Sequence, residues 1–379
     1  MRFVNFDILS IGTKHGISYP TPSNLNYFWG FGSISGFLLI WQVLSGILLA
    51  MHYSPEVSLA FNSLEHIMRD VSGGWLIRYC HSGGASVFFI IVYIHIGRAL
   101  YFRSYRKVAL WYSGIVIFLL MMATAFLGYV LPWGQMSLWG ATVITNILGA
   151  FPIIGKYIVS WLWGGFSVDN PTLKRFFVLH FLLPLVLLGL SVLHLALLHI
   201  SGSTNPLGIC GKMDSVRFYP KFLVKDIFGF LSIVGFFSIL TVFMYPNVLG
   251  HPDNYIKADA LVTPKHIVPE WYFLPFYAIL RAIPNKFGGV VAMFGSILIL
   301  FILPILARFK SKSSKFLILI QFFFWLFVGN IFLLGWLGAC VVEEPFVFIS
   351  QCSTIFYFWY FLVGLPFLSY SENTICKFK

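Results

Sequence analysis

Two apolar stretches of equal length decide the fold of this chain: HSGGASVFFIIVYIH at 81–95 and HFLLPLVLLGLSVLH at 180–194. Each stretch begins and ends with a histidine, and thirteen residues lie between the two members of a pair, whose positions differ by fourteen. Since fourteen residues make nearly four helical turns, both rings of a pair lie within about 40° of one helix face and about 21 Å apart along the axis. Imidazole is the commonest metal ligand, and a haem that takes one from each side keeps no open position, which suits electron transfer. Two such helices predict two stacked haems between them.

The composition places these helices in a membrane. The chain has 379 residues, of which 59% are hydrophobic and only 10% are charged, whereas a soluble domain has about 25% charged residues. A helix needs about 20 mostly apolar residues to cross the hydrocarbon layer. Two connections, 133–172 and 246–286, are long enough to hold function or short helices of their own. Eight spans are predicted, near residues 31–52, 75–102, 111–132, 173–200, 227–245, 287–307, 316–336 and 346–367.

The charge distribution sets the orientation of the spans. An even number of spans puts both termini on one side, together with the second, fourth and sixth connections. That side has 15 Lys and Arg against four acids, while the other side has nine of each. The positive-inside rule turns the basic side toward the cytoplasm or the matrix. The net charge of +12 therefore reflects topology, and no nucleic-acid partner is expected.

Glycines on the two neighbouring spans repeat the histidine spacing. A helix that passes close to a flat haem ring needs a position without a side chain. Because consecutive spans run in opposite directions, the second glycine of each pair falls level with the outer histidines and the first with the inner ones. Four antiparallel helices of this kind make an all-α bundle with a cofactor core. The four glycines are Gly32, Gly46, Gly114 and Gly128.

Each of these patterns has a structural alternative. A histidine inside a membrane can be a satisfied polar residue at a helix contact, and glycine pairs are common where helices pack closely. Two equal spacings of each kind, matched in depth, favour the cofactor interpretation. Arg78 and Arg98, at the two ends of the second span, are candidates to bind haem carboxylates, although Arg98 could also be an interfacial residue. Pro184 is expected to bend the fourth span without ending it.

Further motifs carry a resemblance to a known family. Together with the histidines and glycines, GYVLPWGQ at 128–135, WGATVI at 139–144 and PEWY at 269–272 resemble cytochrome b of the mitochondrial ubiquinol–cytochrome c oxidoreductase. The resemblance covers nearly the whole chain. It implies eight transmembrane helices, with a dihaem four-helix bundle in 1–210 and the remaining helices in 211–379. His81 and His180 would bind the iron of the outer haem b, and His95 and His194 that of the inner one, both without covalent attachment.

The resemblance also implies a quinol-oxidising site on the outer side. Glu270 would accept a proton from ubiquinol, with Tyr129, Gly140 and the catalytic Tyr277 around it. The residues agree in part, because a carboxyl group between Pro269 and two aromatic rings has a raised pKa that suits proton transfer. An ion pair with Arg281 or a nearby lysine is the structural alternative.

A second site, for quinone reduction, would lie on the inner side. His199 and Asp226 would act as catalytic residues beside Ser203 and Lys225, with Asp226 expected to begin the fifth span. Each residue alone could be a helix cap or an interfacial residue. The chain departs from the family at two positions here, since Gly30 and Thr204 stand where asparagine is frequent.

The cysteines indicate which centres must come from partners. The five cysteines form no C-x-x-C motif, so the chain holds no iron–sulfur cluster, and no C-x-x-C-H motif attaches a haem. The resemblance implies a Rieske iron–sulfur protein, cytochrome c1 and other complex III subunits as partners, a homodimeric complex and bound lipid. It places the chain in the mitochondrial inner membrane with both termini on the matrix side. The N-terminus lacks a typical cleavable signal, which is expected of an organelle-encoded or bacterial chain. A simpler dihaem conduit and a transporter with ion-binding histidines are the alternatives.

Overall fold

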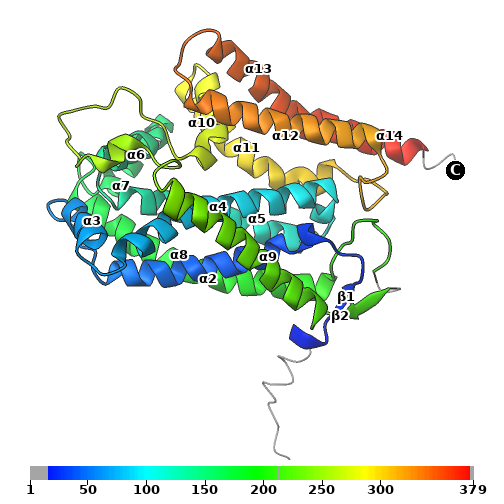
Figure 1. The fold of residues 1–379 in the computed structure, drawn as a ribbon. Helices are drawn as coiled ribbons and strands as arrows, with labels where there is room; N and C mark the ends of the chain where they lie inside the picture. Colours follow the sequence, from blue (N-terminus) through cyan, green and yellow to red (C-terminus); the bar gives the residue numbers. More distant parts are fainter. Residues whose placement is uncertain (1–15, 212–213, 376–379) are drawn as a thin grey trace, which may run out of the picture.

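The computed structural model describes residues 16–211 and 214–375, and long helices dominate it (Figure 1). Within this part of the chain, eight helical segments are long and apolar enough to cross a membrane. They are α2 (Phe31–Ala50), α4 (Gly74–Tyr101), α5 (Val108–Val130), α8 (Asn170–Ser201), α9 (Lys221–Ser238) continued by η5 (Ile239–Met244), α11 (Lys286–Leu306), α12 (Ile318–Ala339), and α13 (Phe346–Trp359) continued by η8 (Tyr360–Gly364) and α14 (Leu365–Ile375). The prediction of an all-α protein with eight transmembrane helices is confirmed.

The predicted start of α9 is wrong, whereas the predicted course of α8 through its proline is confirmed. α9 begins at Lys221, so Asp226 lies in its second turn, and the prediction that Asp226 begins this helix is wrong. Hydropathy marks where the apolar run starts, whereas the backbone hydrogen bonds of a helix continue through charged residues at its end. α8 passes through Pro184 without a break, as expected. Its first turn is fixed by a capping box between Asp169 and Thr172.

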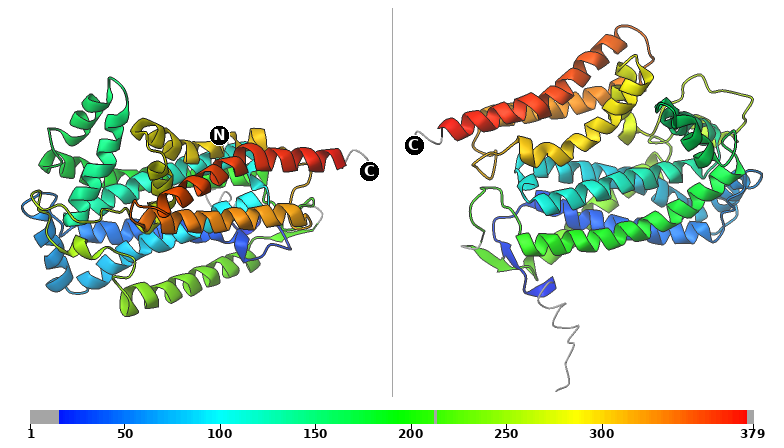
Figure 2. Two further views of the ribbon diagram at one scale, coloured as in Figure 1. Left: turned by 90° about the horizontal axis from the view of Figure 1, so that it is seen from above. Right: turned by 180° about the vertical axis from the view of Figure 1, so that it is seen from behind.

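The first four long helices form two tightly packed antiparallel pairs. α2 packs against α4, and α5 packs against α8. α5 and α8 run side by side when the molecule is seen from behind (Figure 2). α9 lies against α2 and α4. Buried Ile34, Phe89 and Phe118 belong to a single apolar cluster inside the bundle. The four helices therefore hold their inward faces around one core.

The C-terminal helices make a second layer. Buried residues of α11, α12 and the α13–α14 segment form one cluster with Trp111 of α5. The indole of Trp111 donates a hydrogen bond to the carbonyl of Leu300, at 2.7 Å. This layer therefore packs directly on the bundle, and the division at residue 210 stays a prediction.

The long connections contain short helices, as expected. α6 (Gln135–Asn146) and α7 (Gly155–Trp163) lie in the connection 133–172, and α10 (Leu274–Ala282) lies in 246–286. A further short helix, α3 (Ala60–Arg69), lies between α2 and α4, at the same end of the bundle as α6 and α7 (Figure 1). At the opposite end, β1 (Pro20–Pro22) pairs antiparallel with β2 (Ser215–Arg217), a small sheet that the sequence did not predict.

A buried ion pair joins the two layers at the end that carries β1 and β2. Arg103, in the turn between α4 and α5, lies 2.9 Å from the carboxylate of Glu372 in α14, and the two side chains are 1% and 7% exposed. Glu372 also accepts a hydrogen bond from the backbone of Ser311, at 2.7 Å. The guanidinium group of Arg103 stacks on Phe309, 3.8 Å from the ring centre. One turn of the bundle is thereby fixed to the last helix.

Candidate functional site

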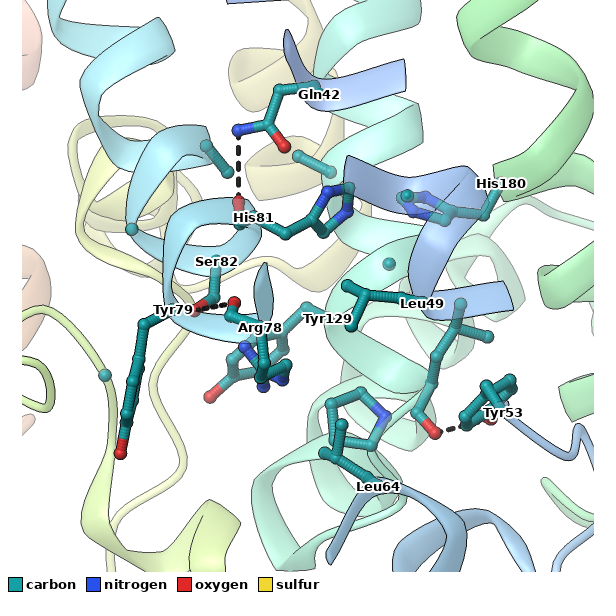
Figure 3. A pocket seen from close by; sticks show the side chains of 18 of the residues that line it. Gln42, Leu49, Tyr53, Leu64, Arg78, Tyr79, His81, Ser82, Tyr129 and His180 are labelled. Carbon is teal, nitrogen blue, oxygen red and sulfur yellow. Dashed lines mark hydrogen bonds between the residues drawn. The ribbon is translucent and has the colours of Figure 1, made fainter. Parts of the chain in front are cut away.

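The four histidines of the two apolar stretches form two facing pairs. The ring centres of His81 on α4 and His180 on α8 are 6.1 Å apart, with an angle of 86° between their planes. Those of His95 and His194 are 6.4 Å apart at 61°. Two imidazole nitrogens on opposite sides of one metal atom, each about 2.0 Å from it, place the ring centres roughly 6.3 Å apart. Both pairs therefore have the separation that a bis-histidine haem requires (Figure 3 shows the first pair).

A glycine lies behind each imidazole ring, at the level that the spacing predicts. A Cβ atom at these glycines would come within 3.0–3.2 Å of the Cε1 atom of the facing ring, and at Gly128 it would overlap the ring outright. The glycines therefore make room for the histidine rings, in addition to any room they leave for a haem. The pairs are Gly46 with His81, Gly128 with His180, Gly32 with His95, and Gly114 with His194.

The Nδ1 atoms of three rings have hydrogen-bond partners, and the carbonyl that contacts His180 fixes the tautomer of that ring. His180 Nδ1 lies 2.8 Å from the carbonyl of Thr124, which can only accept. His81 Nδ1 lies 2.9 Å from Ser45 Oγ, and His194 Nδ1 lies 2.7 Å from Ser113 Oγ. With the proton on Nδ1, the lone pair of Nε2 is free for a metal. These three rings thus fit the role of iron ligands as they stand.

The fourth ring has a different partner. Arg98 donates a hydrogen bond from its guanidinium group to Nδ1 of His95, at 3.1 Å. Since a guanidinium group cannot accept, the His95 ring here carries its proton on Nε2. The Nε atom of Arg98 is buried without a hydrogen-bond partner in the described part of the chain. The ring is therefore in position for a haem, but its ligating tautomer requires Arg98 to turn to another acceptor.

A cavity of about 590 Å³ opens beside the His81–His180 pair (Figure 3). Its lining includes both rings, Arg78, Tyr129 and Glu270. This volume is within the range of small-molecule and cofactor sites, which run from about 300 to 1,000 Å³. The paired imidazoles and the carboxyl group of the PEWY motif thus share one chamber.

Glu270 is partly buried at the wall of this cavity. Burial raises its pKa to about 7, although a hydrogen bond with Tyr129 and the positive charge of Arg78 act in the opposite direction. Such a group exchanges protons near neutral pH. Arg281, the alternative partner, instead donates to the carbonyls of Leu337, Gly338 and Cys340. Among the described residues, no ion pair includes Glu270.

Two residues predicted for the outer site are not part of the lining of this cavity. Tyr277, on α10, is 3.4 Å from the carbonyl of Ile267 through its hydroxyl group, and its ring lies 4.6 Å from the guanidinium of Arg281. Gly140 is buried within α6. Neither residue lines the cavity. Tyr272, the last residue of the PEWY motif, does line it, although no pattern in the sequence marks this ring separately.

At the end of the bundle that carries β1 and β2, the residues predicted for the inner site make the following contacts. The ring of Tyr19 lies 4.3 Å from that of His199, in the last turn of α8. Lys225 donates to the carbonyl of Leu25, at 2.9 Å. Ser203 lies two residues beyond α8, and the following Thr204 is 3.0 Å from Ser104 through their hydroxyl groups.

The glycine that departs from the family pattern has a clear structural role. The Asp226 carboxylate accepts a hydrogen bond from Ser33 of α2, at 2.6 Å. A Cβ atom at Gly30 would lie 3.0 Å from that carboxylate. The absence of a side chain at position 30 therefore gives Asp226 access to α2.

Comparisons with known proteins agree with this geometry. Residues 16–202 match the family model described as Cytochrome b/b6/petB, and residues 257–358 match Cytochrome b(C-terminal)/b6/petD. The chain is 56% identical to cytochrome b of Phytophthora megasperma, covering 100% of this chain and 99% of that one. It is 57% identical to cytochrome b of Chondrus crispus over 100% of both.

A solved structure extends the likeness to the fold. A chain of a hyperthermophilic respiratory complex III superposes with a TM-score of 0.90 at 32% identity, and 97% of this chain and 98% of that chain are covered. The matches span both the bundle and the C-terminal layer. The chain therefore belongs to the cytochrome b family of respiratory complex III, whose members bind haem b and transfer electrons within a membrane.

Proposed function

We propose that this chain oxidises ubiquinol at the outer face, transfers electrons across the membrane through two haems b, and reduces ubiquinone at the inner face. The observation that carries the proposal is the pair of facing imidazoles next to the cavity that also holds Glu270. The second imidazole pair, one level further along the same two helices, supplies the next position for an electron.

The histidine pairs would hold the two haems. His81 and His180 bind the outer iron, and His95 and His194 the inner one. When bound, the haems take up and release single electrons. Arg78, in the lining of the outer cavity, is proposed to bind the carboxylates of the outer haem. Arg98 would bind those of the inner haem, which would release His95 in its ligating tautomer.

At the outer site, Glu270 is proposed to accept a proton from the quinol hydroxyl group. The carboxylate takes the proton as the quinol oxygen loses an electron, and Tyr129 orients the carboxyl group through their hydrogen bond. Tyr277 and Gly140 remain proposed members of the surroundings of this site.

At the inner site, His199 and Asp226 are proposed to supply two protons to the reduced quinone. Asp226 lies against α2 through Ser33, and Lys225 places a positive charge next to it on the same helix. Ser203 would hydrogen-bond a quinone oxygen. Proton release on one side and uptake on the other would make the cycle contribute to the proton gradient.

The cycle requires partners for its outer branch. We propose a Rieske iron–sulfur protein and cytochrome c1 as the electron acceptors, within a homodimeric complex of the mitochondrial inner membrane. Both termini are proposed to face the matrix, and they lie outside the described residues.

A redox difference spectrum tests the proposal. The assembled complex should show two b-type signals, and His180→Leu and His194→Leu should each remove one of them. His66→Leu, in an exposed histidine of α3, is the control and should keep both. If no b-type signal is present, the proposed role of the four histidines as haem ligands is refuted.

A second variant distinguishes a subunit that oxidises quinol from a dihaem protein that only conducts electrons. Glu270→Gln should lower quinol oxidation while both haem signals remain. Unchanged turnover in that variant would reject the role of Glu270.

A further inference from the structure

We infer that Ser45 and Ser113 are positioning residues that fix the tautomer of one histidine in each pair and thereby set the reduction potential of each haem. The inference rests on the proposed function, because it concerns how the ligands of the two haems are held. It adds two residues, on α2 and α5, that bind neither the haem nor a quinone.

Both serines occupy the same place relative to a ring. Ser45 directly precedes Gly46, and Ser113 directly precedes Gly114. In each Ser-Gly step the glycine makes room for an imidazole ring, and the serine hydroxyl meets the Nδ1 atom of that same ring, at 2.9 Å for His81 and 2.7 Å for His194. Each Ser-Gly dipeptide thus leaves space for an imidazole ring and forms a hydrogen bond with its Nδ1 atom.

The direction of these hydrogen bonds follows from the other partner of each hydroxyl group. Ser45 Oγ lies 2.8 Å from the carbonyl of Trp41, and Ser113 Oγ lies 2.9 Å from that of Leu110. A carbonyl only accepts, so we assign the single hydroxyl proton to it, which leaves the oxygen to accept from the ring. His81 and His194 therefore carry their proton on Nδ1 and direct the lone pair of Nε2 to the partner ring.

The opposite ligands are held differently. His180 donates to a backbone carbonyl, and His95 meets Arg98. Each pair therefore contains one ligand with a serine partner, on α4 in the outer pair and on α8 in the inner pair. These serine contacts can be removed by a substitution that leaves the backbone in place.

An acceptor on Nδ1 makes an imidazole ligand more basic. A more basic ligand stabilises the more positive, oxidised iron and lowers the reduction potential. Removal of the hydroxyl group should therefore raise the potential of the haem at that level and leave the other haem unchanged.

The test is an equilibrium redox titration of the purified complex, followed at the two b-type absorption bands. Ser113→Ala should raise the midpoint of the inner haem by about 59 mV, which is a tenfold change in a one-electron equilibrium. Ser45→Ala should do the same for the outer haem. Ser113→Thr, which keeps a hydroxyl group, should restore the original value.

Two serines provide matched controls, one on the helix of Ser45 and one on the helix of His194. Ser35 on α2 and Ser191 on α8 make only intrahelical hydrogen bonds, each at 2.8 Å, to the carbonyls of Phe31 and Leu187. Ser35→Ala and Ser191→Ala should leave both midpoints unchanged.

The outcomes separate this inference from the proposed function. Midpoints in Ser45→Ala and Ser113→Ala equal to those of the controls would overturn the inference while two haems remain present. A Ser113→Ala complex that lacks the inner haem and regains it as Ser113→Thr supports the role, whereas loss in both variants overturns it. A wild-type complex without two b-type signals would refute the proposed function itself.

Discussion

Replacing Gly128 by alanine should remove the outer haem selectively. The added Cβ atom would lie 2.9 Å from Nδ1 and 3.0 Å from Nε2 of His180 and still closer to Cε1, on a ring held by the Thr124 carbonyl. The ring would have to shift from the position in which its centre lies 6.1 Å from that of His81. Overpacking of this kind costs about 1–3 kcal/mol, which corresponds to a roughly 5- to 150-fold weaker binding of the haem.

At the other three glycines, an added Cβ atom would lie further from the facing ring than at Gly128. A Cβ atom at Gly32 or Gly46 would lie 3.0 or 3.1 Å from the nearest ring atom, and one at Gly114 would lie 3.2 Å away. Alanine should therefore be tolerated best at Gly114. Gly36→Ala is the control on α2, because nothing lies within 4 Å of a Cβ atom there.

Difference spectra of the assembled complex, with haem quantified per chain, measure the effect. Gly128→Ala should lose the outer signal and keep the inner one. A full outer signal in Gly128→Ala, together with a lost inner signal in Gly114→Ala, would refute the reasoning from ring contacts.

Three further predictions concern other parts of the molecule. Because the pKa of Glu270 is raised to about 7 and its ionised form accepts the proton, the rate of quinol oxidation should increase as the pH rises through about 7. Glu270→Gln should abolish that inflection in the pH–rate profile. Arg103→Leu breaks a buried ion pair and should cost about 3–5 kcal/mol of stability, seen as a lower melting temperature that the second change Glu372→Leu partly restores. Gly30→Asn should displace Asp226 and slow quinone reduction at the inner site, while the rate of quinol oxidation measured with the inner site bypassed stays unchanged.

The sequence predicts the membrane-spanning helices well because the hydrocarbon layer demands long apolar runs. The equal spacings of histidine and glycine also predict which side chains share a level, since a straight helix converts sequence distance into depth. The start of α9 at Lys221 escapes this reasoning, because charges interrupt hydropathy but leave the helix intact.

Contacts between distant segments could not be predicted in the same way. The ring of Tyr19 reaches His199 from a segment 180 residues earlier in the chain, and no periodicity marks that contact. The Ser-Gly steps at 45–46 and 113–114 were visible in the sequence, but only the packing of α2 on α4 and of α5 on α8 gives them a meaning. Tyr277 and Gly140 could not be excluded from the cavity lining without the path of the loops that carry them.

The pairing of Arg103 with Glu372 has a consequence for biosynthesis. A ribosome makes Arg103 269 residues before Glu372, so the guanidinium group has no carboxylate partner until the final helix has been made. A product cut short before that helix would keep an uncompensated cation at the end of the bundle that carries β1 and β2, a defect that a membrane quality-control protease would recognise. The counter-charge of Arg103 is therefore available only after the last helix has been made.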